Sequence, residues 1–233
     1  YRERGYLSLT NRKRVLVAGV FLGLHFSAFF WGVRNTSIAN ATLLANTGPF
    51  FTALFAFITG KPLNKNGYIG LFLAGFGIFL IQGYDLDLRK EQIIGNVMSL
   101  FSGFFIAVTY VYAKKIRENT KNVIYGRSLF LYAAVTILVI SFSAGNSPFV
   151  FQMKDFYWFL FLGFVPSILG HNLLNYSIKF LSPTAVASVP LGEPIIASIF
   201  GYIIFYEKVP IESLLGSPLV FLGIFFVLNS EKY

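Results

Sequence analysis

Apolar segments long enough to cross a lipid bilayer dominate this chain and limit what it can fold into. A transmembrane helix needs about 20 mostly apolar residues, because its backbone polar groups must bond to one another where water is absent. Hydrophobic residues make up 55% of the 233 residues and charged residues only 12%. The sequence therefore predicts an all-α, polytopic helical membrane protein with spans near residues 15–33, 39–59, 66–83, 92–113, 123–144, 156–178, 184–206 and 213–230.

Lysine and arginine are concentrated in alternate loops between these segments. If the N-terminus lies inside and the spans alternate, the basic residues on the outer side are only Arg34, Arg89, Lys90, Lys154 and Lys208, out of 19 in the chain. Cytoplasmic loops carry such an excess of basic residues. We therefore expect a multi-pass protein of the plasma (cell inner) membrane, with both ends of this chain in the cytoplasm. The net charge of +9 is then explained by basic residues at the ends of the spans, which face the headgroups of the lipid bilayer. No nucleic-acid partner is expected.

One segment occurs twice, as residues 33–58 and 178–203. When the two copies are aligned, Arg34 falls on Lys179, Ser37 on Ser182, Pro49 on Pro194 and Phe55 on Phe200. Each copy is an apolar span with a proline near its middle. Because an odd number of span-to-span steps separates the copies, they are predicted to run antiparallel, as an inverted-repeat bundle. Paired, proline-interrupted spans of this kind indicate the substrate site of a secondary transporter.

Four stretches of the sequence resemble one transporter family. SPTAVASVPLGEPIIASIFGYIIFYEKVP and LLGSPLVFLGIFFVL are similar to the ninth and tenth helices of that family, and SIANATLLANTGPFFTALFAFITGKPLN and GYIGLFLAGFGIFLI to the fourth and fifth. The chain thus resembles the EamA-like family of the drug/metabolite transporter superfamily. This resemblance implies a ten-helix carrier made of two inverted five-helix repeats, with helices three to ten present in this chain.

The resemblance also divides the chain into two parts. Residues 1–83 correspond to helices three to five of the first repeat, without its first two helices, and residues 84–233 correspond to a complete second five-helix repeat. The fourth and fifth predicted spans have no counterpart in the first half, which favours two further helices upstream of residue 1. A complete eight-helix protein is the alternative. One departure from symmetry is that Gly48 of the first copy aligns with Glu193 of the second.

Glu193 is the acidic residue that lies deep within a predicted span. A charge at the centre of a bilayer costs about 3 kcal/mol, so this side chain is expected to face the protein interior or a hydrated cavity. Gly192 and Pro194 flank it and favour a break in the helix. We expect the carboxylate to bind an amine group or a coupling proton. A structural glutamate that bonds to a facing helix is the alternative.

Polar side chains also gather in the sixth predicted span. His171 and Asn175 are four residues apart and share one face of a helix, and Asn172 lies one step around it. Pro166 is expected to kink this span. His25 lies at nearly the same depth in the first span. Buried amides and imidazoles need polar partners, so this group is expected to face protein or water and not lipid.

Two further groups complete the expected site. Asn46 and Thr47 lie one turn before Pro49 in the second span, and Tyr110 and Ser102 offer a ring and a hydroxyl from the fourth span. The predicted substrate-binding residues are therefore Glu193, His171, Asn172, Asn175, His25, Asn46, Thr47 and Tyr110, and the predicted hinges are Pro49, Pro194 and Pro166.

No catalytic or metal-binding pattern is present in the sequence. The chain has no cysteine, which excludes disulfides and thiolate chemistry. We expect a permease that moves a small-molecule metabolite, an amino acid or an amine, across the cell membrane by alternating access, without a cofactor or metal and without enzymatic activity. A truncated, non-transporting scaffold or pseudo-transporter and a membrane-embedded lipid enzyme are the alternatives. The sequence leaves the substrate, the direction of transport, ion coupling and the oligomeric state open.

Overall fold

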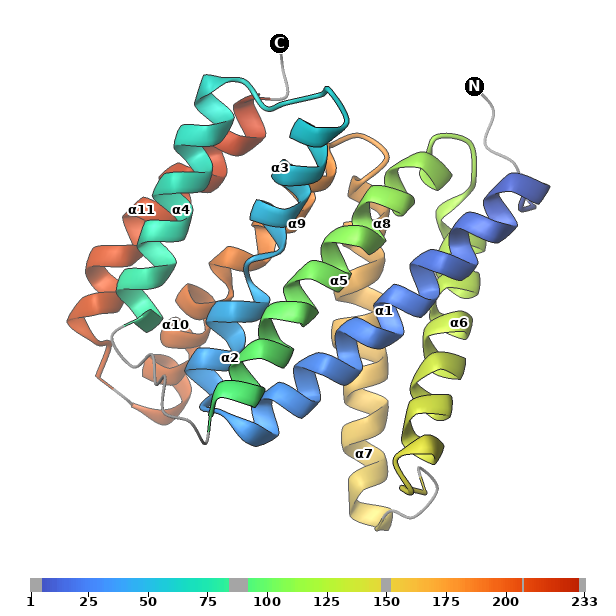
Figure 1. The fold of residues 1–233 in the computed structure, drawn as a ribbon. Coiled ribbons are helices and arrows are strands. Elements are labelled where there is room, and N and C mark those ends of the chain that lie inside the picture. The colour runs from blue at the N-terminus through green and yellow to red at the C-terminus, as the bar shows by residue number, and fades with distance from the viewer. Residues whose placement is uncertain (1–5, 84–91, 148–151, 207, 231–233) are drawn as a thin grey trace.

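The computed structural model describes residues 6–83, 92–147, 152–206 and 208–230, and these form a bundle of helices (Figure 1). Arg89 and Lys90, which contributed to the predicted orientation, lie outside the described residues. The helices are α1 Leu9–Asn35, α2 Ile38–Ala45, α3 Gly48–Ile58, α4 Lys65–Gln82, α5 Ile93–Arg117, α6 Asn122–Ser143, α7 Met153–Leu162, a π-helix Gly163–His171, α8 Asn172–Ser177, α9 Pro183–Ser188, a 3₁₀ helix Val189–Gly192, α10 Glu193–Phe205 and α11 Ile211–Asn229.

The predicted all-helical, membrane-spanning architecture is confirmed. Among the described residues, 7 helical segments are long and apolar enough to cross a membrane, and α4, with 18 residues, is an eighth helix beside α11. The seven are Leu9–Asn35, Ile38–Ile58, Ile93–Arg117, Asn122–Ser143, Met153–Ser177, Pro183–Ile204 and Ile211–Asn229. The chain itself therefore contains seven to eight spans and not ten.

The two copies of the repeated segment begin and break in the same way. Ser37 accepts a hydrogen bond from the backbone N–H of Asn40 at the start of α2, and Ser182 accepts one from Ala185 at the start of α9. The first copy is interrupted between α2 and α3, and the second by the 3₁₀ helix between α9 and α10. Pro49 and Pro194 each lie in the first turn of the helix that follows the break, where a missing N–H leaves no helical bond unmade.

The largest buried cluster joins α1, α5 and α6 to the segment around α9. Small residues allow this close packing, because Gly19 and Gly23 of α1 lie directly against the α6 backbone near Leu129 and Ala133. The polar end of α5 is buried with the apolar residues, and Arg117 is only 1% exposed. The helix α5 therefore runs through the centre of the packed part of the bundle (Figure 1).

A second close contact joins α4 and α11, which lie side by side and antiparallel (Figure 1). A Cβ atom added to Gly70 would lie 2.6 Å from the carbonyl oxygen of Gly223, and one added to Gly223 would lie 2.6 Å from that of Gly70. Gly77 and Gly216 form the same reciprocal pair, at 2.7 and 2.5 Å. The two backbones are thus in direct contact at two levels, which no larger residue permits.

One span is packed very differently from the others. The π-helix and the preceding helix α7 contain no buried residue, whereas half of the most apolar window of Ile93–Arg117 is buried. A Cβ added to Gly163 would meet no heavy atom within 4 Å. Figure 1 shows α7 extending away from the α1–α5 packing. The span Met153–Ser177 therefore presents an open face to its surroundings.

The glycine contacts between α4 and α11 predict the outcome of two alanine substitutions. Gly77→Ala and Gly216→Ala should each lower the free energy of unfolding by about 1–3 kcal/mol, because the added methyl group overlaps a backbone carbonyl. In this 233-residue chain, Gly163→Ala is the matched control, since its methyl group enters open space there and alanine favours the helix. Reversible denaturation of the purified protein in detergent micelles measures the three values. Equal stability of all three variants would contradict the close contact.

Candidate functional site

A cavity of about 720 Å³ lies in the middle of the bundle. Its walls come from α1, α5 and α6, from the breaks of both repeated segments, and from the π-helix region. The polar and charged residues of its lining are His25, Ser27, Asn46, Tyr110, Ser167, His171 and Glu193, and its apolar lining includes Phe26, Phe29, Phe30, Ile106, Leu162 and Leu174. The sequence predicted that His25, Asn46, Tyr110, His171 and Glu193 would belong to one site, and all five border this cavity.

Glu193 is the first residue of α10, directly after the 3₁₀ helix. The N–H groups in the first turn of a helix have no intrahelical acceptors, and the positive end of the helix dipole favours an anion there. The side chain is exposed and borders the cavity. This position keeps a carboxylate available to a bound molecule within the span.

His25 is held in place by Ser102 of α5. The Nδ1 atom of His25 lies 3.0 Å from the carbonyl oxygen and 2.8 Å from the hydroxyl oxygen of Ser102. Because a carbonyl oxygen can only accept, the contact with the carbonyl is a hydrogen bond only when Nδ1 carries the proton. In the neutral ring, Nε2 is then the acceptor that remains for a ligand. Ser102 itself is buried, so its role is to orient the imidazole.

His171 closes the opposite side of the cavity, at the end of the π-helix. Its ring meets Phe26 edge to face, with centroids 5.3 Å apart, and Phe26 lies 5.2 Å from the ring of His25. One phenyl ring thus separates the two imidazoles. The π-helix contains Pro166, and the Ser167 hydroxyl donates to the carbonyl of Leu162, so the predicted kink takes the form of a widened helix.

The break of the first copy contributes Asn46 and Pro49 to the cavity. Helix α2 ends at Ala45 and α3 begins at Gly48, so Asn46 sits where the backbone is not helical. Tyr110 faces the same space from α5 and is only 3% exposed. The interrupted segment therefore gives the cavity an amide and irregular backbone in place of a smooth helical wall.

Four predicted residues lie outside the cavity lining. Asn172 accepts a hydrogen bond from Asn122 of α6 at 2.9 Å, and Asn175 is buried at the end of α8. The hydroxyl of Thr47 donates to the carbonyl of Leu44 at 2.6 Å and packs beside α5. Pro194 lies in the first turn of α10, next to the lining residue Glu193.

Several lining residues were not among those predicted from the sequence. Pro190 lies in the 3₁₀ helix and aligns with Ala45 of the first copy, so the position of the break was the available signal. Ser27 and Ser167 are isolated serines in apolar spans. The aromatic rings gave no usable signal, because phenylalanine occurs 28 times in the chain.

The charged groups of the cavity lining are few. Among the described lining residues, Glu193 carries the acidic group and none is lysine or arginine. The rings of Phe26, Phe29 and Phe30 offer apolar surface and faces that attract a cation. The described residues contain no group of three or more side chains arranged to bind a metal ion. The arrangement is suited to binding a small molecule.

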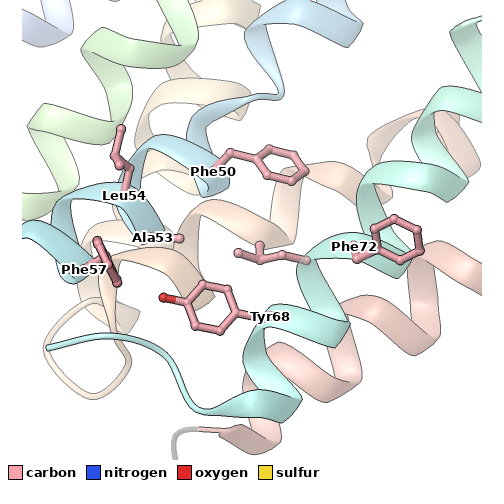
Figure 2. A pocket seen from close by; sticks show the side chains of 7 residues that line it. Phe50, Ala53, Leu54, Phe57, Tyr68 and Phe72 are labelled. Carbon is pink, nitrogen blue, oxygen red and sulfur yellow. The ribbon is translucent and has the colours of Figure 1, made fainter.

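A second hollow, of about 460 Å³, lies between α3 and α4 on the outside of the bundle (Figure 2). It is lined by Phe50, Ala53, Leu54, Phe57, Tyr68, Leu71 and Phe72. The phenolic oxygen of Tyr68 is the polar side-chain atom of this lining, and Figure 2 shows the remaining side chains as apolar. A surface of this kind suits lipid chains and cannot orient a polar metabolite.

Comparison with known proteins gives the chain a family. Residues 2–83 and 93–229 match the EamA-like transporter family. An uncharacterized transporter of Archaeoglobus fulgidus is 22% identical over 91% of this chain and 75% of its own length. The uncharacterized transporter YyaM of Bacillus subtilis is 24% identical over 92% and 72%. The mouse solute carrier family 35 member G1 is 25% identical over 94% of this chain and 62% of its own.

The fold agrees with a solved crystal structure of another chain. The two superpose with a TM-score of 0.76 over 94% of this chain and 76% of the other, at 15% sequence identity. At this identity the likeness shows the fold alone. Since the family match covers both halves and includes every cavity-lining helix, the chain belongs to the EamA-like transporter family of the drug/metabolite transporter superfamily.

Proposed function

We propose that this chain is the substrate-binding part of a permease that moves a small amine or amino acid across the cell membrane by alternating access. The observation that carries the proposal is the position of Glu193, at the helix break of one repeated segment and in the wall of the central cavity. An ammonium group binds between this carboxylate and the aromatic rings, while His25 and Asn46 offer acceptors for further polar groups. A proton on Glu193 is the second cation the site accommodates.

The packing of the repeated segments supports an inverted repeat. Helix α3, the second half of the first copy, contacts α9, the first half of the second copy, as an antiparallel pair requires. The contact of Gly70 with Gly223 becomes the contact of Gly216 with Gly77 when each residue is exchanged for its repeat partner. Both contacts exist at nearly equal distances. In such carriers, the two repeats rock about a site near the bilayer midplane.

Substitution of Glu193 tests the proposed role. Glu193→Gln keeps the size of the side chain and removes its charge, so uptake of a cationic amine should fall about tenfold or more, as expected when a charged hydrogen bond is lost. Radiolabelled amines and amino acids in proteoliposomes, with the protein encoded by the complete gene, give the rate and its pH dependence.

Glu212→Gln is the matched control for this experiment. Glu212 lies in the first turn of α11, as Glu193 lies in the first turn of α10, but it is not part of the cavity lining. The control should transport at the rate of the unmodified protein at equal expression. A Glu193→Gln variant with unchanged rate and pH dependence would remove Glu193 from the mechanism.

The open face of Met153–Ser177 supports the proposed ten-helix carrier. Its repeat partner, α1, is packed against α5 and α6. The same symmetry provides two more helices to cover the face that contains Gly163, Ser167 and Gly170. We infer that these helices are the first two of the first repeat, encoded upstream of residue 1. They also complete the wall of the cavity on this side, where Ser167 and Gly170 border it.

Spin labelling tests the proposed cover of the π-helix. In the product of the complete gene, a nitroxide attached through Gly163→Cys should have low accessibility to oxygen dissolved in the bilayer, because neighbouring helices exclude lipid. A nitroxide at Leu131→Cys, on α6, is the lipid-facing control, since Leu131 is 60% exposed. Electron paramagnetic resonance in nanodiscs measures both. Equal accessibility at the two positions would mean that the face is not covered.

We further propose that the end of the bundle where α1 begins faces the cytoplasm. The basic residues of the described loops are concentrated at this end. The chain has no cysteine, so single cysteines report its orientation without background. Lys121 and Ser147 lie beyond opposite ends of α6, and each is replaced in turn by cysteine. A membrane-impermeant maleimide added to intact cells should label only the cysteine at position 147, and labelling of position 121 alone would reverse the orientation.

A further inference from the structure

The two ends of α5 are attached to the two connections that lead into the repeated segments. The beginning of α5 contacts the α1–α2 connection, and its end contacts the α8–α9 connection. The lining residues Ile106 and Tyr110 lie between these attachments. At 1.5 Å per residue, Ile106 is about 15 Å from Asn96 and Tyr110 is about 10 Å from Arg117. The cavity therefore lies between the two polar attachments, one toward the beginning of α5 and one toward its end.

The attachment at the beginning of α5 consists of neutral groups, and we name it the amide clasp (Thr36, Asn40, Gln92 and Asn96). The Thr36 hydroxyl lies 2.7 Å from Oδ1 of Asn96 and 2.9 Å from Oε1 of Gln92. The Asn40 side-chain amide donates to the Thr36 hydroxyl at 3.1 Å. Asn40 and Asn96 are buried. The clasp fixes the first residues of the first repeated segment against α5.

The attachment at the end of α5 is charged, and we name it the cationic clasp (Lys114 and Arg117 with the carbonyls that they bind). Nζ of Lys114 donates to the carbonyls of Lys179, at 3.2 Å, and Leu181, at 2.9 Å. Nε of Arg117 donates to the carbonyl of Asn175 at 3.0 Å. The last carbonyls of a helix lack intrahelical donors and attract cations. The cationic clasp thus depends on backbone carbonyls that lack helical donors where α8 ends, before the second repeated segment.

Polar atoms without partners lie beside the cationic clasp. The Tyr125 hydroxyl, Oδ1 of Asn122 and Nδ2 of Asn175 are buried and make no hydrogen bond within the described part of the chain. Tyr125 belongs to the same buried cluster as Tyr110, which borders the cavity. Buried polar groups are normally satisfied by protein or by water. Three polar groups without a partner among the described residues are thus buried at this end of the bundle.

We propose that the cationic clasp and the amide clasp are the two gates of the cavity, with Lys114 and Arg117 as the residues that keep it closed at the end where α1 begins. This inference rests on the proposed transport function. Release of the carbonyls at 175, 179 and 181 frees the second repeated segment to move away from α5. Charge-assisted hydrogen bonds are stronger than neutral ones, so the cationic clasp is the tighter gate.

Cysteine accessibility measures the two gates without any need for transport. In the cysteine-free chain, Ser27→Cys places a thiol in the cavity wall. Combined with Lys114→Gln and Arg117→Gln, this thiol should react about tenfold faster with a charged thiol reagent added from the end where α1 begins, as expected from the loss of charged hydrogen bonds. With Asn96→Ala instead, the rate should rise only from the opposite end. Right-side-out and inside-out vesicles expose opposite ends of the bundle to the added reagent.

Two variants control for general loosening of the bundle. Lys115→Gln removes a neighbouring charge that is exposed at the same end of α5, and it should leave the rate unchanged from both sides. Lys114→Arg keeps a cationic hydrogen-bond donor, so the cavity should stay closed at this end and the thiol should react at the unmodified rate. Equal rates from both sides in the Lys114→Gln, Arg117→Gln protein, or a rise that Lys115→Gln reproduces, would overturn the gate assignment.

A cross-link tests the same gate in a chain that keeps every residue of the clasp. Lys115→Cys and Phe180→Cys introduce thiols at two exposed positions beside it. A flexible bis-maleimide should stop transport, while modification by a mono-maleimide should not. Full transport by the cross-linked protein would show that this end never opens. Absence of transport even without the linker would count against the proposed function, and the accessibility rates would still decide the gate.

Discussion

The absence of water in the bilayer is the constraint on which this structure depends. A helix that breaks inside lipid exposes backbone groups that have no partner there, so breaks are tolerated only against protein or a hydrated cavity. The described residues contain three such breaks, after Ala45, across Gly163–His171 and across Val189–Gly192. All three border the same cavity. The irregular backbone and the polar side chains are thus gathered in one place for the same physical reason.

The rest of the bundle separates tightly packed pairs from loosely held parts. The α4–α11 pair is fixed by contacts between glycine backbones, and α1 is fixed between α5 and α6 by small residues of its own. The repeated segments, whose breaks border the cavity, are packed in the buried clusters and are also attached at their ends by hydrogen bonds, such as those of Ser37, Ser182 and the two clasps. Hydrogen bonds of this kind can be exchanged at low cost, whereas interlocked backbones cannot. Tightly packed pairs with hydrogen-bonded connections are compatible with the rocking motion that we propose.

Much of the fold could be predicted from the sequence, because membrane spans follow from apolar length alone. All eight predicted spans contain helices within a few residues of the expected positions, and the residues around Pro49 and Pro194 are interrupted as expected. The convergence of His25, Asn46, Tyr110, His171 and Glu193 on one cavity was also expected, since polar groups in apolar spans avoid lipid. Their binding roles remain a proposal.

The placement of Asn175 could not be predicted in the same way. The sequence argument assumed the period of an α-helix, by which His171 and Asn175 share a face. His171 instead ends the π-helix and borders the cavity, whereas Asn175 is buried in the following helix α8, where its backbone carbonyl accepts a hydrogen bond from Nε of Arg117. The partners of Lys114 and Arg117 were equally hidden. They are backbone carbonyls, which every residue has and which become available only where a helix happens to end.

The two helix breaks also differ in how closely they pack against their neighbours. A Cβ atom on Gly48 would lie 3.2 Å from the side chain of Ile106 and 3.5 Å from the carbonyl oxygen of Gly103, so the break of the first copy lies close against α5. The break of the second copy is open, because a Cβ on Gly192 would meet no heavy atom within 4 Å and the adjacent Glu193 reaches the cavity. The repeated sequence thus gives two helix breaks around one cavity, and among the described residues a carboxylate borders the cavity at one of them. In the carrier that we propose, a bound cation would therefore have one preferred orientation relative to the two proposed gates.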